Sequence, residues 1–407
     1  MSGVRVVDLT SVFMGPLASQ LLGDLGADVI KVEGPGGDTT RGMGPRGDAG
    51  LGPVFLGLNR NKRSVTLDLK REPGRQVLFQ LVESADVLLY NVRPAAMARL
   101  GLGYEEVRGR NPKIIYAGLV GFSQRGPYAP RAAFDDLIQA ASGLSGAIGL
   151  ANAGVPGYVP VALADRAVGL FAFGVIAAAL HGRATTGRGC QVDIPMFETM
   201  VSVVLGDHLY GETFVPAQGP MGYPRLLSPD RRPYRTRDGY LCCTVYTDAN
   251  WRNFLRVIGR ESWFETDPRF ATFASRTQHI DELYALVGDE LAKRDTAEWV
   301  RVLDEVDIPT FPVHTLDSLR TDDHLRATGF FREVEHPVVG TIQQMSHPVE
   351  WDGAVPEPAR LAPTQGEHTR EVLAELGYTA AEIDALIASH AAGETAPAPA
   401  GRTRPSV

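Results

Sequence analysis

One carboxylate occupies a position in the chain where it could act as a nucleophile. Asp165 is the only acidic residue between Asp136 and Asp193, and it directly precedes an apolar run that predicts a helix. A carboxylate can attack an activated carbonyl carbon and form a covalent intermediate, which divides a difficult reaction into easier steps. The same residue could instead cap the helix, and the local sequence alone favours the cap. The two roles are compatible, because a helix N-terminus also keeps a carboxylate ionised.

Small residues, asparagine and arginine follow the predicted strands of the N-terminal half. In an open α/β sheet, ligands bind outside the carboxyl ends of the strands. Arginine side chains and accessible backbone N–H groups suit phosphate oxygens. We therefore expect a phosphate-bearing ligand at this edge, contacted by residues from segments 12–16, 34–41, 91–94 and 121–122.

The common nucleotide-binding motifs are missing from these turns. The turn after the first predicted strand has only Gly15 and lacks GxGxxG, while GPGG at 34–37 follows the second strand without the required spacing. No Walker-type lysine with Ser or Thr follows a glycine-rich loop. A nicotinamide or flavin oxidoreductase and a P-loop nucleotidase are therefore disfavoured.

Composition excludes several other classes of function. The 407 residues carry a net charge of −8 without a basic patch, so we expect no nucleic-acid partner. Cys190, Cys242 and Cys243 show no CxxC spacing, and the nine histidines show no metal-ligand spacing. The N-terminus has no apolar signal core, and the longest apolar run, 168–180, is too short to span a bilayer. We expect a cytoplasmic protein that contacts no membrane and holds no metal.

Strand-like and helix-like segments alternate through the first 120 residues, which predicts an α/β fold with a parallel sheet and helices on both faces. Predicted strands cover 4–9, 28–33, 86–90, 113–118 and 191–194, and predicted helices cover 16–25, 74–83, 104–110, 166–180 and 195–205. Residues 214–232 are rich in Pro, Gly and Arg and indicate a crossing to a second domain. Beyond it we predict a hairpin around Asp238-Gly239 and further helices at 250–259, 277–294, 296–305, 369–376 and 380–389.

Several ordered blocks resemble the class III CoA-transferase family, which includes formyl-CoA transferase, carnitine CoA-transferases and α-methylacyl-CoA racemase. The blocks are GADVIKVEGPGGDTTR (26–41), LNRNKRSVTLDLK (58–70), ADVLLYNVRP (85–94), NPKIIYAGLVGFSQRGPY (111–128) and TGRGCQVDIPMFE (186–198). Later blocks include YRTRDGYL, DHLRATGFF and GEHTREVLAELGY, so the match runs from about residue 3 to about residue 390.

The resemblance implies an unusual architecture. A large Rossmann-like α/β domain would be built from both chain ends, with a smaller central α+β domain, and two chains would interlock as linked rings in a homodimer. On this basis we assign 1–213 to the large CoA-binding domain and 214–323 to the small domain with its linkers. Residues 324–390 would return to the large domain, and 391–407, which lack side chains to bury, would form a disordered tail.

The resemblance also makes Asp165 the catalytic residue. Its carboxylate would attack an acyl-CoA thioester, giving a mixed anhydride and then an enzyme–CoA thioester, from which CoA passes to a free carboxylic acid. The thioester's energy is conserved, so neither ATP nor a metal is needed and CoA enters only as substrate.

Racemases of the family use a His and Asp pair to move a proton. Here Phe134 stands where their His does, followed by Asp135, and Phe cannot exchange a proton. The resemblance therefore favours transfer. An acyl-CoA racemase or isomerase with another acid–base pair, and a catalytically silent CoA-binding protein, stay open as alternatives.

Contacts to CoA transfer by resemblance onto matching positions. Phe13 replaces a polar Gln beside the acyl group, Gly34 replaces an Arg at the adenine, and Val92 replaces a Phe at the nucleotide. The Phe13 change argues against oxalate as acceptor, and segment 218–222 (Gln218 to Gly222) would correspond to a mobile loop over the site. The expected CoA-site residues are Val12, Phe13, Leu67, Lys70, Asn91, Val92, Arg99, Phe134 and Asp135.

Overall fold

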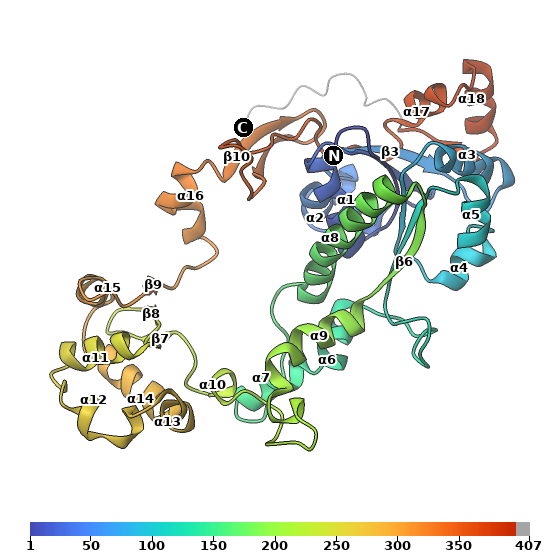
Figure 1. The fold of residues 1–407 in the computed structure, drawn as a ribbon. Helices are drawn as coiled ribbons and strands as arrows, with labels where there is room; N and C mark the ends of the chain where they lie inside the picture. The colour runs from blue at the N-terminus through green and yellow to red at the C-terminus, as the bar shows by residue number, and fades with distance from the viewer. Residues whose placement is uncertain (396–407) are drawn as a thin grey trace. The chain divides into compact units, whose positions relative to one another are not determined.

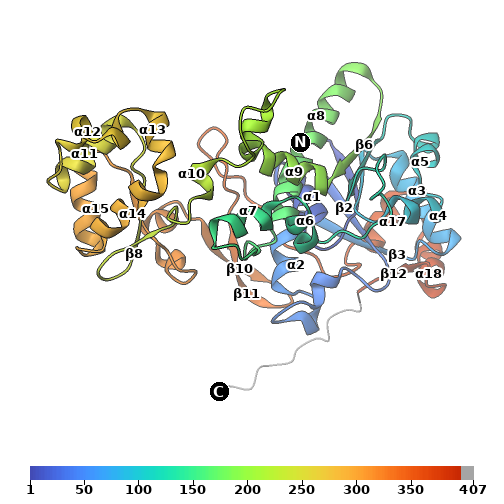
Figure 2. The ribbon, with the colours of Figure 1, turned by 90° about the horizontal axis from the view of Figure 1, so that it is seen from below.

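The computed structural model describes residues 1–395, which fall into two compact units (Figures 1 and 2). The first unit comprises Met1–Ile138, Pro160–Met200 and the described chain from His324 onward, so it contains both chain ends. The second comprises Gln139–Val159 and Val201–Asp323. It thus includes 139–159 and resumes at Val201, whereas the sequence places the crossing at 214.

A seven-stranded sheet with the order β12-β3-β2-β1-β4-β5-β6 forms the centre of the first unit. Every neighbouring pair is parallel except β12 with β3. The predicted α/β fold with a parallel sheet is therefore confirmed. The strands are β1 (Arg5–Leu9), β2 (Asp28–Glu33), β3 (Lys62–Leu67), β4 (Val87–Tyr90), β5 (Ile115–Val120), β6 (Cys190–Pro195) and β12 (Ala392–Gly393).

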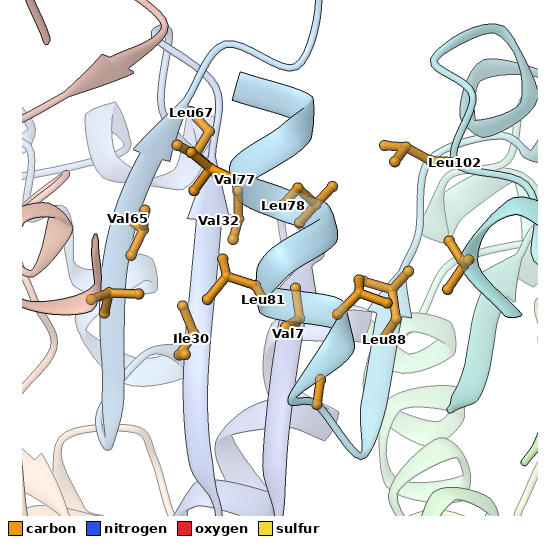
Figure 3. Close-up of a cluster of buried hydrophobic side chains, with 14 of the residues drawn as sticks. Val7, Ile30, Val32, Val65, Leu67, Val77, Leu78, Leu81, Leu88 and Leu102 are labelled. Atoms are coloured by element: carbon orange, nitrogen blue, oxygen red, sulfur yellow. The ribbon is translucent and has the colours of Figure 1, made fainter. Parts of the chain in front are cut away.

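Helices cover both faces of this sheet (Figure 1). On one face, α3 (Glu72–Glu83) contributes Val77, Leu78 and Leu81 to an apolar core that also contains Ile30 and Val32 of β2 (Figure 3). The same core takes in residues of α5 (Tyr104–Arg110), α17 (Thr369–Glu375) and α18 (Ala380–Ala388). On the opposite face, α1 (Met14–Asp24) packs against α8 (Leu163–Thr186).

Strand alternation gives the two faces different chemistry. Val7 of β1 faces the apolar core, whereas its neighbour Asp8 is fully buried on the other face. Asp8 pairs in register with Lys31, and Lys31 with Ser64 of β3. A buried polar row therefore crosses the sheet beneath α1. No strand is predicted over β3 from the sequence, yet its Lys62 and Arg63 are both buried.

Further elements complete the first unit. A two-stranded antiparallel ribbon joins β10 (Phe331–His336) to β11 (Gly340–Met345). Short helices include α2 (Pro53–Leu58) and α4 (Pro94–Arg99), and a 3-10 turn, η1, spans Thr39–Gly42. Between β5 and α8 the chain forms α6 (Asp135–Ala141), and α9 (Met196–His208) follows β6; the first unit includes α6 as far as Ile138 and α9 as far as Met200.

The second unit has its own core. A small antiparallel sheet of β7 (Tyr234–Arg235), β8 (Tyr240–Cys243) and β9 (Thr310–Pro312) packs with Trp251, Phe254 and Trp299. Its helices include α7 (Leu144–Ala151), α10 (Pro224–Leu227), α11 (Asp248–Val257), α12 (Trp263–Thr266), α13 (Phe273–Gln278), α14 (Ile280–Leu291) and α15 (Thr296–Asp304).

Two expectations need correction. The helix predicted at 166–180 is the 24-residue α8, and by length and composition alone it is the one described helix that could cross a membrane, a test that core helices of soluble proteins also pass. The tail predicted to be disordered from 391 begins as structure, because Ala391 and Ala392 are buried and β12 pairs with β3. The rest of that predicted tail, 396–407, lies outside the described residues.

Candidate active site around Asp165

Asp165 lies in the first turn of α8, three residues after the N-cap residue Ala162. The helix-cap interpretation is wrong, because Ala162 occupies that position and no side chain caps the helix. Instead, the backbone N–H of Asp165 donates to Oδ1 of Asp135, the first residue of α6, at 2.9 Å. Two carboxyl groups from separate helices are therefore brought together.

The surroundings make the Asp165 carboxyl unusually basic. Burial raises its pKa to about 6, the negative charge of Asp135 adds to the rise, and Arg166 partly opposes it. At neutral pH the group is still mainly ionised. A weakly solvated carboxylate of raised basicity is a better nucleophile than an ordinary surface aspartate.

A cavity of about 790 Å³ opens beside Asp165 at the carboxyl edge of the sheet. It is large enough for a substantial part of a CoA thioester. The walls come from the loop after β1, from α4, from the chain between β5 and α6, and from the start of α8 and α9. Six predicted residues line it together: Val12, Asn91, Val92, Arg99, Phe134 and Asp165.

Two predicted residues border this cavity without lining it. Phe13 is the N-cap residue of α1, and the Arg166 guanidinium lies 5.9 Å from its ring centroid. Asp135 acts through its bond to the Asp165 backbone. Phe134, by contrast, projects 68% of its surface to solvent. Among the described residues that line the cavity there is no imidazole.

Arginines dominate the charge of the cavity. Arg93, Arg99 and Arg131 line it, and Asp165 is the one carboxylate among the described lining residues. This excess of positive charge favours a phosphate-bearing or carboxylate ligand. Arg93 follows β4 in the NVRP run, a signal visible in the sequence. Arg131 lies in the irregular 121–134 connection, where no periodic pattern identified it as a site residue.

Leu67 and Lys70 lie at a second cavity of about 460 Å³, together with Gly34 and Leu100. They are therefore placed at the same sheet edge as the first cavity but not in its walls. Leu67 is fully buried, whereas Lys70 is exposed and its backbone N–H donates to Asp68. The two cavities could hold different parts of one long ligand.

The segment from Gln218 to Gly222 belongs to the second unit. Its backbone pairs locally, with Gln218 donating to Gly211 and Gly222 donating to His208. Its role over the active site stays a prediction. Within residues 1–395, no group of three or more His, Cys, Asp or Glu is placed to hold a metal ion.

Comparison with known proteins identifies relatives across nearly the whole chain. It is 34% identical to an acyl-CoA transferase of Fusarium pseudograminearum, over 94% of this chain and 86% of that protein. It is 32% identical to a succinyl-CoA:glutarate CoA-transferase of Mus musculus, over 96% and 89% of the two chains. It is 33% identical to a formyl-CoA:oxalate CoA-transferase of Escherichia coli, over 96% and 99%.

Solved structures agree with the sequence relatives. Rv3272 from Mycobacterium tuberculosis superposes with a TM-score of 0.77 at 31% identity, covering 91% of this chain and 98% of that one. A CAIB/BAIF family protein from Brucella suis gives 0.75 at 30% identity, covering 92% and 98%. The family profile described as CoA-transferase family III matches residues 1–369. The chain therefore belongs to CoA-transferase family III.

Proposed function

We propose that this acyl-CoA:carboxylate CoA-transferase uses the carboxylate of Asp165 as its covalent nucleophile. One observation carries the proposal: Asp165 is the carboxylate in the wall of an arginine-lined cavity, and burial beside Asp135 raises its pKa to about 6. The group is thus ionised at neutral pH, poorly solvated and open to a ligand. A surface aspartate would be solvated and weakly basic.

The first half-reaction releases the donor acid. An Asp165 oxygen attacks the thioester carbonyl carbon, the carbon–sulfur bond breaks, and CoA leaves as a thiolate. The acyl group is then joined to Asp165 as a mixed anhydride. The thiolate then attacks the Asp165 carbonyl carbon. The donor acid departs with one former Asp165 oxygen, and CoA is left as a thioester on the enzyme.

The second half-reaction repeats these steps in reverse with the acceptor acid. Its carboxylate attacks the enzyme thioester, re-forms an anhydride and expels CoA thiolate. The thiolate attacks the acceptor's carbonyl carbon, and Asp165 is regenerated with one oxygen from the acceptor. Atoms and charge balance without an additional reactant.

The surrounding residues divide the supporting roles. Arg93 and Arg99 hold phosphates or the acceptor carboxylate in the first cavity, and Lys70 serves the far end of CoA in the second. Backbone N–H groups of the glycine-rich loops would stabilise the developing oxyanions. Asp135 fixes the Asp165 backbone and keeps its carboxyl basic.

The acceptor is proposed to be a carboxylic acid larger than oxalate. Met14 supplies apolar surface to the cavity, Phe13 borders it as the N-cap residue of α1, and Arg131 offers a cation for a second carboxylate. A screen should pair succinyl-CoA and formyl-CoA with glutarate, oxalate and branched acids. We expect exchange with a dicarboxylic acid and ping-pong kinetics. Absence of exchange with every pair would contradict the proposal.

An isomerase is the second candidate, because Asp135 and Asp165 together could exchange a proton. Solvent deuterium would then appear at the α-carbon of an acyl-CoA without any acceptor acid. Phe134 at the cavity wall supplies no proton, which favours transfer.

We further propose a cytoplasmic homodimer that contacts neither nucleic acid nor membrane. Leu170 and Phe171 of α8 are 57% and 53% exposed in the single chain. Exposure of large apolar side chains is unfavourable, and burial against a second copy would remove it. Sedimentation should give twice the chain mass without detergent. A stable monomer would contradict this assembly.

A further inference from the structure

The loop of residues 10–13 joins β1 to α1, and Ser11 and Val12 line the cavity beside Asp165. Val12 has a φ of 73°, in the left-handed region. For a β-branched residue this conformation is strained, since its side chain crowds the backbone. Such strain persists only where surrounding groups over-determine the backbone.

Side chains from β2, from the segment after it and from the segment after β4 hold the backbone that leads into the strained residue. Lys31 Nζ donates to the Thr10 carbonyl at 2.8 Å. The Val12 N–H donates to both Asp38 oxygens at 3.3 Å. Between them, the Asn91 amide accepts from the Ser11 N–H at 3.0 Å and donates to its carbonyl at 2.8 Å. The loop is thus clamped by groups distant from it in the sequence.

Lys31 and Asp38 form the charged part of this clamp. Their side chains are completely buried and meet at 2.9 Å. Asp38 also accepts from the Thr40 N–H and hydroxyl at 3.0 and 2.8 Å, which fixes its orientation. A buried ion pair contributes little net stability compared with apolar residues of the same volume. The ion pair therefore matters more for the orientation of the loop than for the stability of the fold.

The loop also determines where α1 begins. A Cβ on Gly15 would lie 2.3 Å from the Thr10 Cβ, so the first turn of α1 is packed directly on the loop. A Cβ on Gly169 of α8 would lie 2.7 Å from the Met14 carbonyl oxygen. Gly169 is four residues, about one turn, beyond Asp165. A shift of the loop would therefore move one cavity wall relative to the nucleophile.

We propose that Lys31 and Asp38 are positioning residues that hold Val12 in its left-handed conformation and thereby shape the acyl-CoA site beside Asp165. This inference rests on the proposed function for its catalytic consequence. The clamp itself is a property of the fold and has its own readout.

A double-mutant cycle tests the clamp. Asp38→Asn should raise the KM for acyl-CoA about tenfold, because the uncharged amide no longer anchors the strained loop. Glycine adopts positive φ without strain, so in a Val12→Gly background the same change should raise KM by threefold at most. The melting-temperature loss caused by Asp38→Asn should likewise shrink in that background. Equal effects in both backgrounds would overturn the proposal.

Asp24→Asn is the matched control, because Asp24 forms a buried ion pair with Arg60 at the other end of α1. It should lower the melting temperature without coupling to Val12→Gly. If Asp38→Asn does not fold, the paired change Lys31→Met with Asp38→Leu removes both charges at similar volume and replaces it in the cycle. An inactive wild type that still shows coupling in melting temperature would reject the proposed function but keep the clamp.

Discussion

Two groups of aspartates in the first unit meet opposite electrostatic surroundings. Asp8 and Asp38 are buried beside Lys62 and Lys31, at 3.2 and 2.9 Å. Burial alone would raise the pKa of each, but the lysines and hydrogen bonds outweigh it and the net shift is downward. Asp165 is also partly removed from water, yet the charge of the Asp135 carboxyl acts on it more strongly than that of Arg166, and its pKa rises to about 6.

On the proposed mechanism, this difference in pKa separates structural aspartates from a reactive one. Where cations satisfy the carboxylates, ionisation is favoured and the groups hold backbone in place. Where a half-buried carboxylate at a cavity wall has the charge of another carboxylate nearby, ionisation is costly and the group is left basic and accessible. Active sites commonly retain such unfavourable groups at the expense of stability.

The largest expected effect falls on Asp165. Asp165→Ala should reduce CoA transfer by about 10³- to 10⁴-fold or more, because the covalent route is lost. The measurement is the initial rate of acyl-CoA formation with the best acceptor. Asp136→Ala, at the exposed neighbour of Asp135, is the control and should retain activity within about twofold. Equal loss in both variants would remove Asp165 from its role.

Substitutions around the lysine-paired aspartates Asp8 and Asp38 should change the stability of the protein. Lys62 is fully buried and contacts Asp8, the Pro16 carbonyl and Asn59. Lys62→Met should lower the free energy of unfolding by about 3–5 kcal/mol, since Asp8 loses a buried partner. Denaturant unfolding measures the change. A loss below about 1 kcal/mol would mean that Lys31 alone compensates Asp8.

Removing the charge at Asp165 should raise the free energy of unfolding, whereas Lys62→Met lowers it. Its folded pKa lies above the ordinary 3.8, so the folded state loses stability as pH rises from about 4 to 6. Asp165→Asn should therefore stabilise the protein at pH 7.5 by about 1–2 kcal/mol, after discounting for its partial exposure. The gain should vanish near pH 4. Destabilisation at pH 7.5 would show that the carboxylate is satisfied by the fold.

The smallest effect is a shift along the pH axis. Transfer requires ionised Asp165, so kcat/KM should fall below pH 6 and be about tenfold lower at pH 5. Asp135→Asn keeps an oxygen for the Asp165 N–H but removes the charge. The fall of kcat/KM on the acid side should therefore move about one pH unit lower. Asp136→Asn serves as control. An unmoved limb would leave burial as the sole cause.

Much of the first unit was predictable, since β2 and α5 occupy the residues that alternation and helical spacing predict. β3 was not, because Lys62 and Arg63 become interior residues only through partners elsewhere in the chain. β12 was not predicted either, because Ala392–Gly393 has no strand signal and forms a strand by pairing with β3.

The candidate site could also be predicted only in part. Strand ends predicted a ligand at the edge where the cavity lies, and family resemblance favoured Asp165 as a nucleophile over a helix cap. Its pairing with Asp135, the contribution of Arg131 and the strained Val12 depend on distant segments meeting. Such contacts follow from the fold, and no local pattern encodes them.

The most direct test of the account is the mass of the enzyme after reaction with an acyl-CoA donor in the absence of acceptor. Rapid acid quenching followed by peptide mass spectrometry should find CoA, with loss of water, on the peptide containing Asp165. Addition of the acceptor acid before quenching should discharge it. An active enzyme that never gains this mass, or that carries it on another residue, would contradict the account.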